Sequence, residues 1–290
     1  MMLLFFRKKK TFFLCVLTLR RAAEAFVAPP VAKPSICVQR SMMLLPEDVS
    51  LSVAAVQATS VFIASVVGFG DALMAVPLLA TMGVDLSVAA PLVSCTSVWM
   101  FSGSLLKERT PVGKWNVSAA LTAGALLGIP CGVHALSNVD PQLIQHTLGA
   151  GLLAYAFWSR FFLSGPRRKL PVVTAAIPFG FVAGLLGGSV SSPGPPAIVF
   201  SRLADWDPVT SRVMLFRFFL PVQILATLGF YKAGLLTPAI LHQTLVSAPL
   251  VFAAITVGSR LNGKLKPAVY ANLITGILSL VGLLCLFSSS

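Results

Sequence analysis

The chain contains the stretch GFGDALMAVP at Gly68–Pro77 and, much later, the stretch GGSVSSPGPP at Gly187–Pro196, each inside a long apolar segment. Both stretches run nine positions from a glycine to a proline. Glycine and proline break helices, and a helix broken at membrane depth leaves N–H and C=O groups unpaired unless the break is buried in protein or lines a wet cavity. The two stretches therefore predict a pair of interrupted helices.

The composition indicates a membrane protein. Of the 290 residues 56% are hydrophobic and only 11% are charged, which is far from the balance of a soluble domain. A helix needs roughly 20 apolar residues to cross a bilayer. Runs of about that length are 49–70, 86–106, 115–139, 141–159, 170–201, 233–259 and 267–290, with 213–231 if Arg217 is tolerated. We predict an all-α polytopic membrane protein of about eight transmembrane helices in two repeats, with 72–84 and 193–201 as broken or re-entrant segments.

The first 45 residues have the composition of a targeting leader. A basic cluster at 7–10 precedes a short apolar stretch and an Ala-Glu-Ala site, which predicts a signal peptide over 1–25. Residues 26–45 begin with Phe26 and contain basic residues and serines but no acidic residue, as transit peptides do. The leader resembles the bipartite presequences of algae with secondary plastids, which implies a plastid membrane. A secretory or mitochondrial leader, and hence another organelle or the plasma membrane, is the alternative.

The spacing of glycines and prolines divides the remaining chain into two halves. Gly132 lies nine residues before Pro141, and Gly258 lies nine before Pro267, each pair preceding a final apolar run. We predict a first transmembrane repeat over 46–163, a basic linker over 164–170 and a second transmembrane repeat over 171–290. Paired breaks in two such halves are typical of a transport site.

The duplicated motifs resemble those of a known family. The glycine-led break ending in proline, a basic turn about thirty residues on and the Gly-x8-Pro junction, all duplicated, resemble the TauE/SafE family of sulfite exporters over 49–287. The second break matches the family's glycine-rich run ending in Pro-Pro, whereas the first has Asp71-Ala72 where the family tends to have further glycines. The resemblance implies a secondary transporter, without ATP or another cofactor, of sulfite, organosulfonates or a related small anion.

The physical chemistry of the breaks points to the same kind of ligand. A helix that restarts after a break presents unpaired N–H groups and the positive end of its dipole, which suits an anion. Serine hydroxyls at the second break could hold anion oxygens or hydrogen-bond neighbouring helices. The predicted substrate-binding residues are Gly68, Gly70, Asp71, Pro77, Gly187, Gly188, Ser189, Ser191, Ser192, Gly194, Pro195, Pro196 and Arg217.

Two charged residues lie within apolar sequence. Arg217 would provide a fixed charge for the anion if it faces a cavity, or would extend to the interface from the start of its span. Asp71 would carry a proton if burial keeps it neutral, or would pair with a basic residue or meet water at a cavity mouth. Ser94–Ser97 offers further hydroxyl groups in the middle of a span, which helix back-bonding would satisfy.

Two other functions are weighed against a carrier. A passive anion channel on the same fold fits the sequence equally well. Gly-Phe-Gly-Asp at 68–71 also spells the signature of intramembrane aspartyl proteases, but that chemistry needs two carboxylates sharing one site. Only Asp48 precedes Asp71 here, at the edge of a span, so we expect no enzyme.

The remaining residue types suggest few other partners. No CxxC or HExxH spacing occurs, so no metal site is predicted. The basic residues are confined to short loops, which makes nucleic acid an unsuitable partner. The expected partners are a small anion and the lipid bilayer, and a homo-oligomer is compatible with the sequence.

The distribution of basic residues predicts an orientation. With eight spans, the loops at 107–114 and 164–169 lie on the same side as the N-terminus and Lys232, and the positive-inside rule assigns that side to the stroma or cytoplasm. Arg260 is then expected on the opposite side, in conflict with the rule.

Overall fold

The structure is a computed structural model that describes residues 47–107, 115–140 and 172–261, together with 142–144, 146, 147, 149, 150, 153, 276, 279 and 280. The predicted leader and linker lie outside the described residues, as do most of the predicted spans 141–159 and 267–290. All of the described residues belong to one compact unit of the chain.

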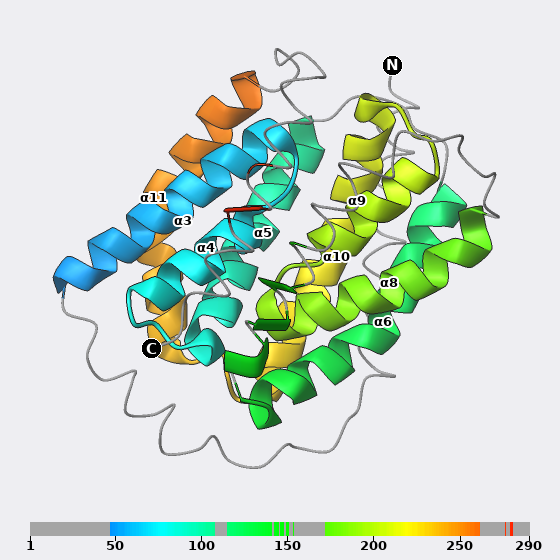
Figure 1. Ribbon diagram of the computed structural model, residues 1–290. Coiled ribbons are helices and arrows are strands. Elements are labelled where there is room, and N and C mark those ends of the chain that lie inside the picture. Colours follow the sequence, from blue (N-terminus) through cyan, green and yellow to red (C-terminus); the bar gives the residue numbers. More distant parts are fainter. Residues whose placement is uncertain are drawn as a thin grey trace. The chain divides into compact units, whose positions relative to one another are not determined.

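The described part of the chain consists of helices and turns (Figure 1). The helices in order are α3 (Glu47–Val67), α4 (Asp71–Thr81), α5 (Leu86–Lys107), α6 (Trp115–Asn138), α8 (Val172–Val190), α9 (Gly194–Leu203), α10 (Pro208–Lys232) and α11 (Pro238–Leu261). Five of them, α5, α6, α8, α10 and α11, are long and apolar enough to cross a membrane, whereas the apolar parts of α3 and α4 are shorter. The prediction of an all-helical membrane protein is confirmed, while the total of eight spans stays a prediction.

Both predicted interruptions are present. The chain leaves its helix between α3 and α4 and again between α8 and α9. At the first break Gly68 and Gly70 have φ of 100° and 99°, a left-handed conformation that glycine adopts without steric penalty. At the second break Ser191 has φ of 56°, which is uncommon for a residue with a side chain. The segments after the breaks are short helices, as predicted.

The breaks are narrower than the Gly-to-Pro stretches in the sequence. Pro77 lies inside α4, and residues 187–189 belong to the last turn of α8. Pro195 and Pro196 form the first turn of α9, where a missing N–H leaves no hydrogen bond unmade. The helices restart at Asp71 and at Gly194, which lie at different distances from the first glycine of each stretch. The equal nine-residue spacing therefore does not mark structurally equivalent positions.

Helices α6 and α8 pack in close parallel contact through glycines that recur every four residues. Gly124, Gly128 and Gly132 line α6, and Gly180, Gly184 and Gly188 line α8. A Cβ atom at Gly128 would lie 2.0 Å from the carbonyl oxygen of Phe181, and one at Gly184 would lie 2.4 Å from that of Ala125. Small residues at this spacing allow helix backbones to approach closely in membranes. This packing keeps residues 187–189 helical despite the low helix propensity of glycine.

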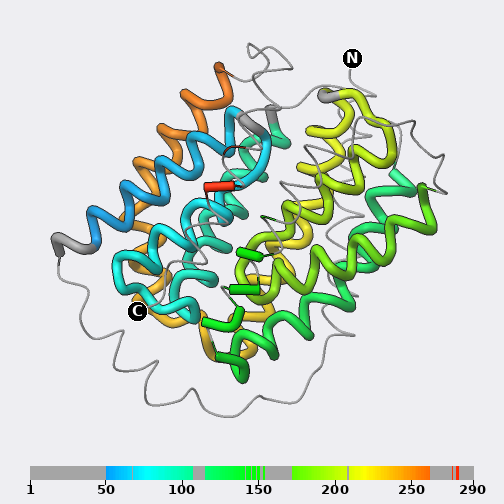
Figure 2. The backbone as a smooth tube through the Cα atoms, viewed as in Figure 1, coloured from blue at the N-terminus to red at the C-terminus, as the bar shows by residue number. Residues whose placement is uncertain are grey.

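The helices run in two opposite directions (Figures 1 and 2). Helices α3 and α11 are parallel, since Ser50 bonds to Gln243 near their starts and Ser65 contacts Gly258 near their ends. Helix α5 runs with them, and α6, α8 and α10 run the other way.

The direction of α5 corrects the expected position of Arg260. Trp99 of α5 stacks on Phe252 of α11 with ring centroids 5.5 Å apart. These parallel helices end at Lys107 and Leu261, and Arg260 lies in the last turn of α11. Arg260 therefore lies at the same end of the bundle as Lys107, and Lys232, at the end of the antiparallel α10, lies at the other. The expected sides were wrong because α4 and α9 each reverse the chain partway, so that α3 and α5 share a direction, as do α8 and α10. We call the end with Lys107 and Arg260 the basic end.

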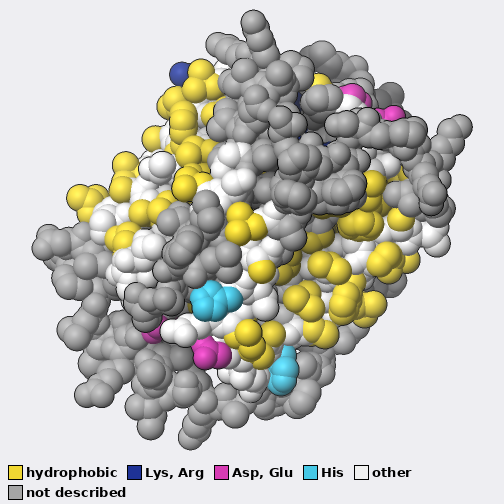
Figure 3. Space-filling model, viewed as in Figure 1, with side chains coloured by type: hydrophobic (Ala, Val, Ile, Leu, Met, Phe, Trp, Pro, Cys, Tyr) yellow, Lys and Arg dark blue, Asp and Glu magenta, His cyan; other side chains and the backbone are white. Residues whose placement is uncertain are grey.

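Large apolar side chains cover much of the described surface in view (Figure 3). The outward sides of α8 and α11 carry many of them: Val173, Ile177, Phe181, Val182, Leu241, Leu245, Leu250, Phe252 and Val257. An apolar surface of this extent fits contact with lipid chains.

Candidate functional site

The two breaks meet in the folded chain. A Cβ atom at Gly194 would lie 3.6 Å from Cδ2 of Phe69 and 3.9 Å from Cδ1 of Leu73, both at the first break. A pocket lies between them. It is lined by Phe69, Gly70, Asp71, Ala72 and Leu73 from the first break, Ser191, Ser192, Pro193 and Gly194 from the second, Phe101 of α5 and Phe219 of α10. Four separate parts of the chain thus converge on one small space.

The pocket is small. It offers about 10 Å³ to the centre of a water molecule, which is close to what one buried water requires. The rings of Phe101 and Phe219, with centroids 5.1 Å apart, lie on its apolar side. An anion with several oxygens would enter only after the walls move apart.

Asp71 is the one ionisable residue among the described residues that line the pocket. It is the first residue of α4, and only 4% of its surface is exposed. The hydroxyl of Ser97, on α5, hydrogen-bonds to Oδ2 of Asp71, and the same hydroxyl oxygen lies 2.8 Å from the carbonyl oxygen of Val93. Within the part of the chain that the structure describes, no lysine, arginine or histidine lines the pocket, so the predicted pairing with a basic residue is not seen there.

Ser191 and Ser192 have different roles. Ser191 donates its hydroxyl hydrogen to the carbonyl oxygen of Ala90 at 2.6 Å, and its own carbonyl accepts from Nε2 of Gln223 at 3.0 Å. These bonds hold the backbone of the break. Ser192 is 2% exposed, and its hydroxyl has no hydrogen-bond partner in the part of the chain that the structure describes. Buried hydroxyls rarely stay unpaired, so Ser192 is the group whose donor is available to a ligand.

The helix ends at the pocket are unequal. Helix α4 begins after Gly70, which caps it without a side chain, and the amide of Ala72 in its first turn donates to the carboxyl group of Asp71. Helix α9 begins with Gly194 and then Pro195 and Pro196, which have no N–H. The start of α4 therefore offers more backbone donors to an anion than the start of α9.

Several predicted residues lie away from the pocket lining. A Cβ atom at Gly188 would lie 2.4 Å from the carbonyl oxygen of Ile129 in α6, and Ser189 donates to the carbonyl of Leu185 in its own helix. The predicted residues that line the pocket are Gly70, Asp71, Ser191, Ser192 and Gly194. Those that do not are Gly68, Pro77, Gly187, Gly188, Ser189, Pro195, Pro196 and Arg217.

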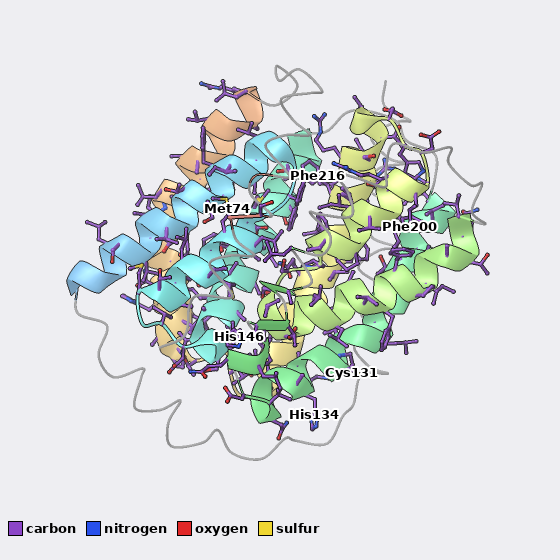
Figure 4. The ribbon with its side chains drawn as sticks, in the orientation of Figure 1. Met74, Cys131, His134, His146, Phe200 and Phe216 are labelled. Carbon is purple, nitrogen blue, oxygen red and sulfur yellow. The ribbon has the colours of Figure 1, made fainter. Side chains whose placement is uncertain are left out.

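Arg217 lies near the start of α10, toward the basic end. Its guanidinium carbon stands 4.2 Å from the centre of the Trp115 ring at the start of α6. The preceding residue, Phe216, labelled in Figure 4, contacts Phe101 of α5 with ring centroids 6.1 Å apart. Phe219 is the α10 residue that lines the pocket, and Arg217, two positions earlier, leaves the helix on a nearly opposite side.

Sequence reasoning missed the aromatic wall of the pocket. Phe101 and Phe219 are apolar residues in apolar spans, and nothing in the sequence distinguishes them from lipid-facing residues. Ser97 was recognised as a polar group in mid-span, but its position beside Asp71 depends on how α4 folds back against α5.

Other reactive side chains are dispersed. Cys131 and His134 are exposed near the end of α6 (Figure 4). No three His, Cys, Asp or Glu side chains gather among the described residues in a way that would hold a metal ion. Asp207 caps α10 by accepting from the amide of Thr210 at 2.9 Å, and no second carboxylate of residues 47–107, 115–140 or 172–261 lines the pocket beside Asp71.

Comparison with known proteins gives one family. The family model described as "Sulfite exporter TauE/SafE" matches residues 53–285, a range that includes both breaks and the pocket. No curated protein and no solved structure matches the chain.

Proposed function

Because the chain belongs to the TauE/SafE sulfite exporter family, we propose that this integral membrane protein is a secondary transporter of sulfite, an organosulfonate or a related small anion. The anion passes through the pocket between the two breaks. The observation that carries this assignment is the convergence of both breaks on a space that holds the buried hydroxyl of Ser192, for which the described residues provide no hydrogen-bond partner.

The pocket offers donors that suit an oxyanion. The Ser192 hydroxyl and the first amides of α4 can each donate to a sulfite or sulfonate oxygen, much as amides at a helix N-terminus hold phosphate. Gly70 and Gly194 leave the backbone open to close approach, because neither has a Cβ atom that would project into the site.

The arrangement of the helices supports two inverted repeats, 46–163 and 171–290. In this comparison α3 corresponds to α8, α5 to α10 and α6 to α11. The close contact between α6 and α8 then corresponds to the close contact between α11 and α3. Matched helices run in opposite directions, as helices related by an axis in the membrane plane do.

The leader and the charge distribution support a location. The leader over 1–45 directs the protein to a plastid membrane, and the basic end faces the stroma or cytoplasm. Imaging of a fluorescent fusion with and without residues 1–45 tests the first statement, and retention in the secretory system would contradict it.

The transport assignment is tested in liposomes. We expect purified full-length chain to take up labelled sulfite, and Ser192→Ala to slow this uptake because one donor to the anion is lost. Ser201→Ala is the matched control, since Ser201 is buried in α9 and bonds to the carbonyl of Ile198 in its own helix. Folded protein that moves neither sulfite nor a sulfonate would overturn the substrate class. Equal uptake by Ser192→Ala and wild type would overturn the site.

A further inference from the structure

We propose that the Asp71 carboxyl group is the proton-binding site of the transporter, and that it carries its proton as a hydrogen bond to Oγ of Ser97. The proton-binding step is carboxylate plus proton to carboxylic acid, and it requires no other reactant. Its coupling to an anion rests on the proposed function, whereas the proton site itself rests on the geometry of Asp71 and Ser97.

The number of hydrogens available at Ser97 carries the argument. Its hydroxyl oxygen contacts both Oδ2 of Asp71 and the carbonyl oxygen of Val93, the latter at 2.8 Å. A serine hydroxyl has one hydrogen, and a carbonyl oxygen can only accept. If Asp71 were ionised, the single hydrogen of the Ser97 hydroxyl would have to serve both acceptors. With a proton on Asp71, the carboxyl donates to Ser97 and Ser97 donates to Val93, so that each contact is a hydrogen bond.

The surroundings of Asp71 favour the neutral form. The side chain is buried, and an isolated buried carboxylate is costly unless it is paired. Among the described residues that line the pocket, its neighbours are Phe101 of α5, Phe219 of α10 and the serines of the second break, which carry no charge. The helices packed against α4 carry a few other titratable groups. Cys95 of α5 lies on the side of Thr244 in α11. Lys107 is the last residue of α5, and Glu47 and Asp48 are the first two residues of α3.

The proton site lies beside the donors proposed for the anion. Asp71 and Ser192 line the same pocket, so an anion held there would be repelled by an ionised Asp71 and tolerated by a neutral one. A proton on Asp71 therefore raises the affinity of the pocket for the anion, and a bound anion raises the affinity of Asp71 for the proton by the same factor. The expected mode is symport, in which one proton on Asp71 moves together with the anion.

Infrared spectroscopy of the full-length chain in lipid nanodiscs tests the proton site without any transport. We expect a carboxylic acid C=O band near neutral pH that is lost in Asp71→Asn and shifted in Ser97→Ala. Ser94→Ala is the matched control, because Ser94 lies one turn earlier on α5 and bonds to Thr227 of α10 instead. A spectrum near neutral pH that is the same in wild type and Asp71→Asn would overturn the proposal.

Liposome flux tests the coupling. An inward proton gradient should drive accumulation of labelled sulfite by wild type, and Asp71→Asn should lose this accumulation. Exchange of labelled for unlabelled sulfite needs no net proton movement. Asp71→Asn should therefore keep this exchange if it has lost only proton coupling, and should lose it if it no longer binds the anion. Accumulation that persists in Asp71→Asn, or that follows a sodium gradient instead, would overturn proton coupling at Asp71. An infrared band with no anion flux would refute the proposed function and leave the proton site standing.

Discussion

Ser191, at the second break, donates a hydrogen bond of 2.6 Å to the carbonyl oxygen of Ala90, on α5. The two residues are 101 positions apart in the chain. Gln223 of α10 holds the carbonyl of Ser191 from the other side, at 3.0 Å. The break in one half of the chain is thus fixed by a helix of the other half, and this link determines where Ser192 lies in the pocket.

Replacing Ser191 separates the hydrogen bond from the backbone conformation. Ser191→Ala should lower the free energy of unfolding by about 1 kcal/mol, since a buried donor to Ala90 is lost. Ser191→Gly loses the same bond but relieves the left-handed conformation at φ 56°, which costs a residue with a Cβ about 1 to 2 kcal/mol. The glycine variant should therefore be the more stable of the two in thermal unfolding of the detergent-solubilised protein. Ser189→Ala, whose hydroxyl bonds within its own helix, should change little, and an alanine variant as stable as the glycine variant would contradict this account.

Adding one methyl group to the α6–α8 contact should disrupt the fold. In Gly128→Ala the new Cβ atom would lie 2.0 Å from the carbonyl oxygen of Phe181, so the two helices must move apart. Overpacking costs about 1 to 3 kcal/mol or more, and here the atoms that must shift belong to the backbone. Gly103→Ala is the control, because its Cβ atom would lie at an ordinary 3.5 Å from Ile255. Size-exclusion profiles and thermal midpoints should separate the two variants, and equal behaviour would mean that the helices are not in this close contact.

Arg217 should act on the anion at a distance. Its guanidinium group stands over Trp115 and is not among the pocket-lining residues, so Arg217→Ala should leave the pocket donors in place. Loss of a positive charge at the basic end should slow sulfite uptake at low ionic strength, and the difference from wild type should shrink as salt screens the field. Arg217→Lys keeps the charge and should behave more like wild type. A loss of uptake in Arg217→Ala that is the same at all salt concentrations would instead place Arg217 in direct contact with the substrate.

The cap of α10 should give the protein an acid-sensitive component of stability. Hydrogen bonds from the side chain and amide of Thr210 hold the pKa of Asp207 below its ordinary value. This stabilisation is present above the ordinary carboxylate pKa of about 3.9 and is lost as the pH falls through the lower pKa of the folded state. Asp207→Ala should therefore unfold at a lower temperature than wild type near neutral pH, with a difference that shrinks in acid. Asp207→Asn can still cap the helix without a charge, and an Ala variant whose deficit grows in acid would contradict the assignment.

The local features were largely predictable from the sequence. Gly68 and Gly70 made the first break predictable, because left-handed backbone at membrane depth requires glycine or a specific compensation. Glycines 124, 128 and 132 recur at a spacing that is typical of a close helix contact, a signal that the prediction lacked. Gly187 and Gly188 were assigned to the break, and the structure shows them in α8, since packing against α6 outweighs their low helix propensity.

Relations between distant segments could not be predicted from the sequence. The contact between Asp71 and Ser97 requires α4 to fold back along α5, and the short length of α4 permits either this return or a continued crossing. The same uncertainty about whether α4 and α9 turn back caused the wrong prediction of the side on which Arg260 lies. Each reversal of the chain that is not recognised changes the predicted side of all the loops that follow it.

What the sequence by itself determined is the class of the protein: apolar runs of membrane length, two interrupted helices and the motifs that it shares with the TauE/SafE family. These properties depend on composition and on the backbone preferences of glycine and proline, which act locally. The tertiary structure alone decided that the breaks meet, that Phe101 and Phe219 close the pocket and that Ser192 has an unpaired hydroxyl among the described residues. Those features depend on the directions and close approach of helices far apart in the chain, and the spacing of residues along one segment carries no information about its distant neighbours.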